Sequence, residues 1–170
     1  MGLDDNVRCH VTATHPAVVD DSGLSVGYDS VRICLDDFDL LVVPGGYGVD
    51  SLRGDAQTMT YLRSWGERRP IASVCSGSLL LGDCGWLHGL PAITHHQRVT
   101  QLTPMCRVVV TGQRVVDAGR VVTSGGVSCG IDVGLHLVEK YWSAAARAAI
   151  ATQMEYPDAT RVVQVPTTCT

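Results

Sequence analysis

The residue best suited to nucleophilic chemistry is Cys75, in the segment Ser73-Val74-Cys75-Ser76-Gly77. The apolar residues before it predict a buried strand and those after it a helix, so Cys75 stands at the turn between them. The free N–H groups of a helix's first turn favour negative charge and would stabilise a thiolate there. Ser76 and Gly77 are small enough for the sharp turn of a nucleophile elbow. The alternative is a buried structural cysteine, the usual fate of a free cysteine.

Glycines at the ends of predicted strands supply a second element. Gly45 and Gly46 follow a continuously apolar run, one strand–helix unit before Cys75. Ligands bind at the carboxyl ends of parallel strands, and glycines there let backbone N–H groups form an oxyanion hole. An ordinary loop is the alternative. Gly125, in Ser124-Gly125-Gly126, ends another predicted strand, and we expect its backbone to shape the same pocket.

His95 and Lys140 are further candidates for chemistry. His95 follows a short apolar piece and is predicted to line the same edge as a base or polar clamp, although most histidines serve neither role. Lys140 is the only lysine, but beside Glu139 it suggests an exposed helical turn and is a poor candidate for a Schiff base. No His/Cys pair has the spacing of zinc ligands, so neither a metal nor a cofactor is expected.

The elements that must position these residues alternate between strands and helices. Such alternation predicts an α/β fold with a doubly wound, mostly parallel sheet. Strands are expected over 7–13, 39–44, 71–74, 107–110 and 114–123, with a small hairpin over 20–28 outside the main sheet. Helices are expected over 55–69, from Gly77 through Trp86, over 129–142, and from Ser143 as N-cap. The final residues have no clear assignment.

Composition excludes several classes of function. The 170 residues suit one domain, and a net charge of −4 without a basic cluster argues against nucleic acid or an anionic membrane surface. No apolar run is long enough for a membrane span or a signal peptide. Seven irregularly spaced cysteines favour free thiols in a reducing cytoplasm over a disulfide framework.

Several motifs together resemble the ThiJ/PfpI, or glutamine amidotransferase-like, superfamily. They are Pro44-Gly45-Gly46, Ser73 to Ser78, Thr94-His95, and Thr123 to Gly126 with Gly130-Ile131-Asp132, in that family's order and spacing. The resemblance covers a domain over residues 1–157, followed by a tail over 158–170. It is strongest to isocyanide hydratases and to the ligand domains of AraC-type regulators. Ser76 replaces the histidine that follows the cysteine in PfpI-type proteases, which disfavours a Cys-His protease.

The resemblance implies a small-molecule enzyme, most concretely one that hydrates an isocyanide through a Cys75 adduct hydrogen-bonded by Ser76. A glyoxalase- or deglycase-like activity on α-oxoaldehydes is the enzymatic alternative. A non-catalytic ligand-binding or regulatory module, and an incomplete subunit that awaits a partner, are the others. The resemblance also implies a homodimer, for which Trp86 and Trp142 are possible exposed anchors.

One departure from the family concerns its first strand. The family places that strand in the centre of the sheet, followed by a loop whose carboxylate lies near the cysteine. Here the matching region begins at the end of the first helix, so the strand and its acidic loop are expected to be absent. Asp4 and Asp5 are the nearest carboxylates in sequence. A longer N-terminus, another chain, or the β-branched segment 161–165 is expected to fill the vacant position.

Overall fold

A five-stranded sheet forms the centre of the molecule, in a computed structural model that describes residues 7–20, 22–156 and 162–164. Its strand order is β3-β4-β8-β7-β9. The strands are β3 (Leu41–Val43), β4 (Ile71–Val74), β7 (Val115–Ala118), β8 (Val121–Ser124) and β9 (Val162–Gln164). β3, β4 and β8 are parallel, whereas β7 runs antiparallel to β8 and parallel to β9. The predicted mostly parallel α/β sheet is therefore confirmed.

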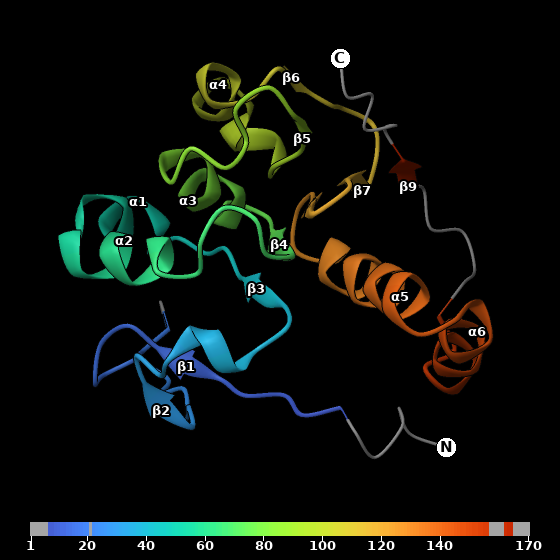
Figure 1. Cartoon of the computed structure of the whole chain (residues 1–170), viewed down its shortest axis with the longest axis horizontal. Helices are drawn as coiled ribbons and strands as arrows, with labels where there is room; N and C mark the ends of the chain where they lie inside the picture. Colours follow the sequence, from blue (N-terminus) through green and yellow to red (C-terminus); the bar gives the residue numbers. More distant parts are fainter. Residues whose placement is uncertain (1–6, 21, 157–161, 165–170) are drawn as a thin grey trace.

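Helices cover both faces of this sheet (Figure 1). On one face lie α1 (Val49–Gly54), α2 (Ala56–Arg63) and α3 (Gly77–Asp83), and on the other lie α5 (Cys129–Tyr141) and α6 (Ala144–Gln153). Side chains alternate between the faces, as the period of a strand requires. Ile71 joins the core of the first face, and Ala72 packs with Val133 of α5 on the second.

Shorter elements complete the upper part of the molecule in Figure 1. β5 (Pro91–Ala92) pairs in parallel with β6 (Val108–Val109). Between them lie three short helices, η2 (His96–Arg98), α4 (Val99–Leu102) and η3 (Thr103–Met105). Among the described residues, no helix has the length and apolar character needed to cross a bilayer.

The N-terminal segment, defined here as residues 7–38, forms a separate unit beside the main sheet. It contains β1 (Thr12–Ala13), β2 (Ser30–Val31) and η1 (Leu35–Asp37). Within the described ranges, β1 and β2 pair with each other and with no other strand. The strand expected over 7–13 is therefore only two residues long. An antiparallel bridge between Val19 and Ser25 confirms the small hairpin.

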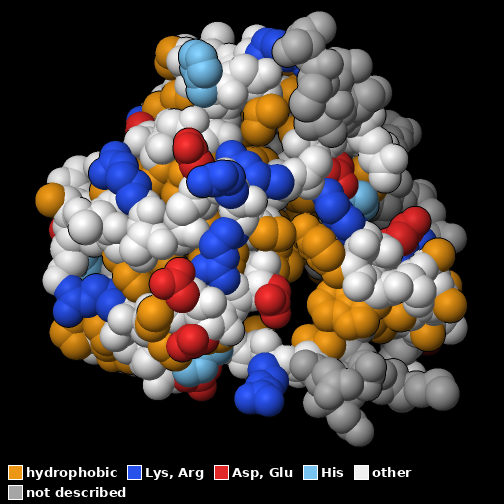
Figure 2. Space-filling view, viewed as in Figure 1, with side chains coloured by type: hydrophobic (Ala, Val, Ile, Leu, Met, Phe, Trp, Pro, Cys, Tyr) orange, Lys and Arg blue, Asp and Glu red, His pale blue; other side chains and the backbone are white. Residues whose placement is uncertain are grey.

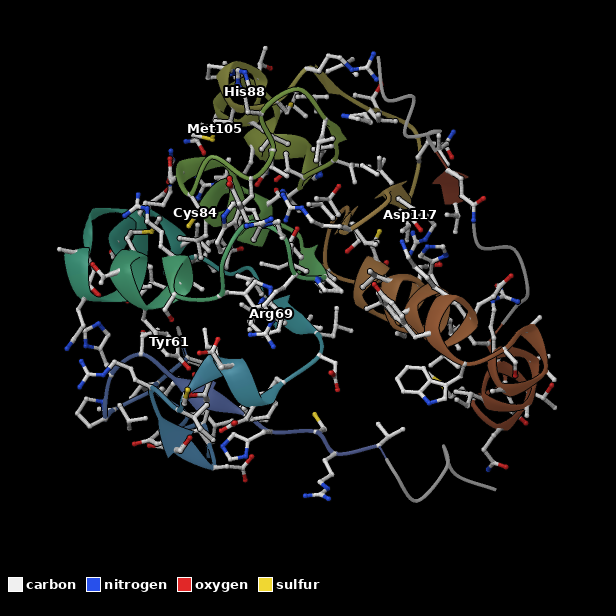
Figure 3. The ribbon with its side chains drawn as sticks, viewed as in Figure 1. Tyr61, Arg69, Cys84, His88, Met105 and Asp117 are labelled. Carbon is white, nitrogen blue, oxygen red and sulfur yellow. The ribbon has the colours of Figure 1, made fainter. Side chains whose placement is uncertain are left out.

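Side chains, rather than sheet hydrogen bonds, attach the N-terminal segment to the body. Tyr61 Oη donates to the carbonyl of Ile33 at 3.0 Å. The Arg69 guanidinium donates to the carbonyls of Leu35 at 2.9 Å, Asp36 at 3.2 Å, and Phe38. Figure 3 shows Tyr61 and Arg69 at the boundary between the two parts. Leu35, 4% exposed, adds a buried apolar contact.

The outer edge of β3 has no neighbouring strand among the described residues, because β1 does not pair with it. Val42 of β3 is 45% exposed. In Figure 2 a hollow with hydrophobic side chains around it opens between the N-terminal segment and α5. The prediction that segment 161–165 fills the vacant position is wrong for its described part, since β9 pairs with β7 at the opposite edge. Asp4 and Asp5 lie outside the described residues, as does most of the 158–170 tail.

Two further expectations about side chains are corrected by the structure. Lys140 is not an exposed helical residue, because its Nζ donates to both carboxylate oxygens of Asp117, at 2.7 and 2.9 Å, and to the Gly119 carbonyl. Trp86 is only 5% exposed and packs in the core, so it cannot serve as an exposed interface anchor. Trp142 is 44% exposed, so its role as an interface anchor stays a prediction.

Candidate functional site

The turn from β4 into α3 places Cys75 in a strained conformation. Its φ of 57° lies in the left-handed region, which residues other than glycine rarely adopt, and this is the geometry of a nucleophile elbow. The Cys75 N–H donates to the carbonyls of Ser124, at 3.1 Å, and Gly125, at 2.9 Å. Thr94 Oγ1 and Ser78 Oγ both donate to the Cys75 carbonyl at 3.1 Å. Strain and a surrounding set of hydrogen bonds together indicate a functional position.

Ser76 joins the elbow to the loop after β3. It is 3% exposed, and its Oγ accepts from the Gly46 N–H and donates to the Gly46 carbonyl, both at 3.1 Å. A Cβ at Gly45 would lie 2.7 Å from the Ser76 nitrogen, and one at Gly77 would lie 2.4 Å from the Val43 carbonyl oxygen. Only glycine allows so close an approach of the two backbones. The predicted residues of the first two motifs therefore do meet.

His95 lies directly after Thr94 and packs on the Gly125–Gly126 loop. A Cβ at Gly126 would lie 2.8 Å from His95 Cδ2. Burial lowers the pKa of His95, and the neighbouring charges of His96 and Arg98 lower it further. The imidazole is thus predominantly neutral near pH 7, with Nδ1 accepting from the Gln97 N–H at 3.3 Å. This is the protonation state that a base requires.

Gly125 connects the elbow to the start of α5. Its carbonyl accepts from Cys75 and its N–H donates to the Arg114 carbonyl at 3.0 Å. The Arg114 guanidinium binds the buried Asp132 carboxylate through two nitrogens, at 2.8 and 2.6 Å, and donates to Ser128 Oγ at 2.9 Å. These charge-assisted bonds fix the loop over 124–128.

Two exposed apolar side chains border the site and were missed from sequence. Tyr47, directly after Gly46, is 82% exposed, and Val127, directly after Gly126, is 84% exposed. Their sequence positions could have identified them, since each residue directly follows a predicted glycine loop. Thr94 was recognised only as part of a motif, because its bond to the elbow spans 19 residues.

Other features do not extend the site. Among the described residues, no group of three or more His, Cys, Asp or Glu side chains could hold a metal ion. A hollow of about 710 Å³ lies elsewhere, beside α1 and α2. Its charged residues pair with one another: Arg53 binds Asp83 at 2.5 and 3.1 Å.

Comparisons with known proteins agree with this geometry. The DJ-1/PfpI family model matches residues 7–140. Isonitrile hydratase from Pseudomonas putida is 38% identical over 122 residues, which cover 71% of this chain and 53% of that enzyme. The chain thus spans about half the length of that relative.

Solved structures show the same relationship. A ThiJ/PfpI family protein from Pseudomonas syringae matches with a TM-score of 0.79 and 32% identity, over 88% of this chain and 63% of that one. Schizosaccharomyces pombe DJ-1 shares the fold, with a TM-score of 0.69 and 19% identity over 83% of this chain and 78% of its own. With its cysteine elbow between the Gly45–Gly46 and Gly125–Gly126 loops, the chain belongs to the DJ-1/PfpI family.

Proposed function

We propose that this chain is a cysteine-dependent enzyme that hydrates an isocyanide, R–N≡C, to an N-substituted formamide. The observation that carries the proposal is the Cys75 elbow, with its φ of 57° and its backbone held from β8 and Thr94. The 38% identity to isonitrile hydratase over 71% of the chain supports this choice of substrate.

The reaction divides one difficult hydration into two easier steps. The Cys75 thiolate attacks the terminal carbon, an S–C bond forms, and that carbon takes up a proton to give a thioimidate, R–N=CH–S–Cys75. Water then adds across the C=N bond, its oxygen to the carbon and one proton to the nitrogen. The C–S bond breaks as the hydroxyl group loses its proton and becomes the carbonyl. The thiolate is regenerated, the released proton replaces the one taken up by carbon in the first step, and the product R–NH–CHO leaves.

Neighbouring residues have defined parts in this proposal. Ser76 Oγ, placed by Gly46, turns its one proton from the Gly46 carbonyl to the nitrogen of the adduct, and the Gly45–Gly46 and Gly125 backbones line the pocket. His95, with its lowered pKa, accepts the proton of the attacking water. Tyr47 and Val127 offer apolar surface to the substituent R.

A ligand-binding module is the second candidate, and one observation favours it. Within the described part of the chain, the hydrogen bonds to Cys75 and Ser76 come from hydroxyl and backbone groups, and none comes from a carboxylate. A module of this kind binds the small molecule without converting it.

Formamide production from an alkyl isocyanide tests the proposal. Wild type and the matched control Cys84→Ala should turn over, and Cys75→Ala should not, while all three keep the same far-UV circular dichroism. Normal turnover by Cys75→Ala would refute the mechanism. Saturable binding by wild type without formamide would establish the binding module instead, and competition by methylglyoxal would identify an α-oxoaldehyde enzyme.

The reactivity of the thiol provides a separate test that needs no substrate. Iodoacetamide labelling between pH 5 and 8, located by peptide mass spectrometry, should modify Cys75 at pH 6 well ahead of the other cysteines. Labelling no faster than that of an ordinary exposed thiol such as Cys34 would mean that the elbow does not stabilise a thiolate.

A further inference from the structure

A second thiol, that of Cys129, lies against the loop that holds the nucleophile. Cys129 is the first residue of α5 and is 6% exposed. A Cβ at Gly125 would lie 3.3 Å from Cys129 Sγ, so this sulfur packs against the Gly125 backbone. The same Gly125 accepts the Cys75 N–H at 2.9 Å. Both cysteines are therefore joined to one residue.

A further contact brings the segments of the two cysteines together. A Cβ at Gly130, next to Cys129, would lie 3.7 Å from Val74 Cγ1, next to Cys75. A disulfide needs Cα atoms within about 7 Å, so it requires neighbouring segments of this kind.

The two thiols differ in exposure. Cys129 is buried, and this burial raises the pKa of its thiol, although the nearby Arg114 opposes the shift. Cys129 is therefore shielded from bulk reagents, whereas Cys75 is half-buried at the elbow. In such a pair the accessible thiol reacts first and the buried one second.

We propose that Cys129 is a resolving thiol, which forms a reversible disulfide with Cys75 after a hydroperoxide has oxidised Cys75. The Cys75 thiolate attacks the distal oxygen of R′OOH, the O–O bond breaks, and Cys75 sulfenic acid and R′OH form. The Cys129 sulfur then attacks the Cys75 sulfur, an S–S bond forms, and hydroxide leaves and takes a proton to become water. In total, two thiols and one hydroperoxide give a disulfide, an alcohol and water.

This activity uses the nucleophile of the proposed hydratase but needs no isocyanide. The disulfide protects Cys75 from further, irreversible oxidation to sulfinic and sulfonic acid. The Cys75 thiol is therefore lost only until the disulfide is reduced. The hydratase stops while Cys75 is in the disulfide and resumes on reduction.

Peptide mapping tests the inference. The full chain is treated with hydrogen peroxide, its remaining thiols are blocked with iodoacetamide, and it is digested without reduction. Wild type and the matched control Cys84→Ser should yield a cross-linked Cys75–Cys129 peptide that dithiothreitol removes. Cys129→Ser, or Cys129→Ala if the first variant does not fold, should lose that peptide and accumulate Cys75 sulfinic acid.

The oxidation products of wild type can also refute the inference. If wild type accumulates Cys75 sulfinic acid as fast as Cys129→Ser, and its Cys129 is alkylated after unfolding, the inference is refuted. Because the cross-link is mapped directly on wild type, this result does not depend on any variant. It is also separate from hydration, since a chain with no formamide production can still form the disulfide.

Discussion

The strain at Cys75 predicts that glycine is unusually well tolerated at this position. A non-glycine residue in the left-handed region costs about 1–2 kcal/mol, and Cys75 has a φ of 57°. Replacing Cys75 with glycine removes that cost, whereas replacing it with alanine retains it. Both replacements remove the thiol, so neither should produce formamide.

Cys84 is the reference for those effects of a glycine substitution that do not depend on backbone strain. Cys84 ends α3 with φ −76° and ψ −8°, and like Cys75 it is half-buried. At such an ordinary helical position, glycine is less stable than alanine by roughly 0.5–1 kcal/mol. The lost Cβ and the added chain entropy act at both sites, and only the strain differs. The free energy of unfolding of the glycine variant minus that of the alanine variant should therefore be about 1–2 kcal/mol more favourable to glycine at residue 75 than at residue 84.

Urea unfolding of the four variants measures this difference. With a slope of roughly 2 kcal/mol per molar urea, the midpoint of Cys75→Gly should move upward relative to Cys75→Ala by about 0.5–1 M more than for the Cys84 pair. Equal midpoint differences at the two sites would show that Cys75 carries no strain, and the elbow argument would fail.

Three other variants test the remaining architecture. Gly77→Ala, whose Cβ would lie 2.4 Å from the Val43 carbonyl oxygen, should displace the elbow and abolish labelling of Cys75 at pH 6, while Gly54→Ala, where space is open, should not. Burial would raise the pKa of Asp117, but hydrogen bonds from His136 and Lys140 outweigh it and lower the pKa from 3.8 to about 2. The ionised carboxylate therefore adds about 2 kcal/mol to the free energy of unfolding above pH 4, and this contribution is lost as the pH falls toward 2. In acid unfolding curves, Asp117→Asn should lack this loss of stability, whereas the exposed control Asp37→Asn should keep it. Arg69→Ala should speed proteolytic cleavage within residues 7–38, since it removes hydrogen bonds to three carbonyls, and equal rates for Arg69→Ala and the exposed control Arg68→Ala would contradict the role of Arg69.

The central part of the fold was predictable because its signals are local. The apolar runs before Pro44 and Cys75 predicted two strands, which the structure confirms, although Val42 of β3 is exposed; both runs end in residues that need special backbone geometry. Ser143 is the N-cap of α6, as predicted, and its Oγ accepts from the Ala146 N–H at 3.0 Å. The glycine loops followed from the same reasoning.

The rest depends on contacts between residues distant in sequence. The alternation over 7–13 indicated a strand, but without a neighbour in the main sheet only Thr12–Ala13 pairs. β-branched residues place Val162–Gln164 in a strand without specifying which edge it joins. Asp117, labelled in Figure 3, is 23 residues from its partner Lys140, so their local sequences did not predict the pair.

The attachment of residues 7–38 through side chains has a consequence for how the molecule opens. β1 and β2 share no ladder with the main sheet, so this segment can detach without breaking a single bond of β3, β4 or β8. Its amide protons should therefore exchange with solvent through a partial opening of lower free energy than global unfolding. The amides of Ile71–Val74 and Val121–Ser124 should exchange only when the whole sheet unfolds. Two levels of protection are therefore expected in the described part of the chain, and Cys75 stands on the more protected one.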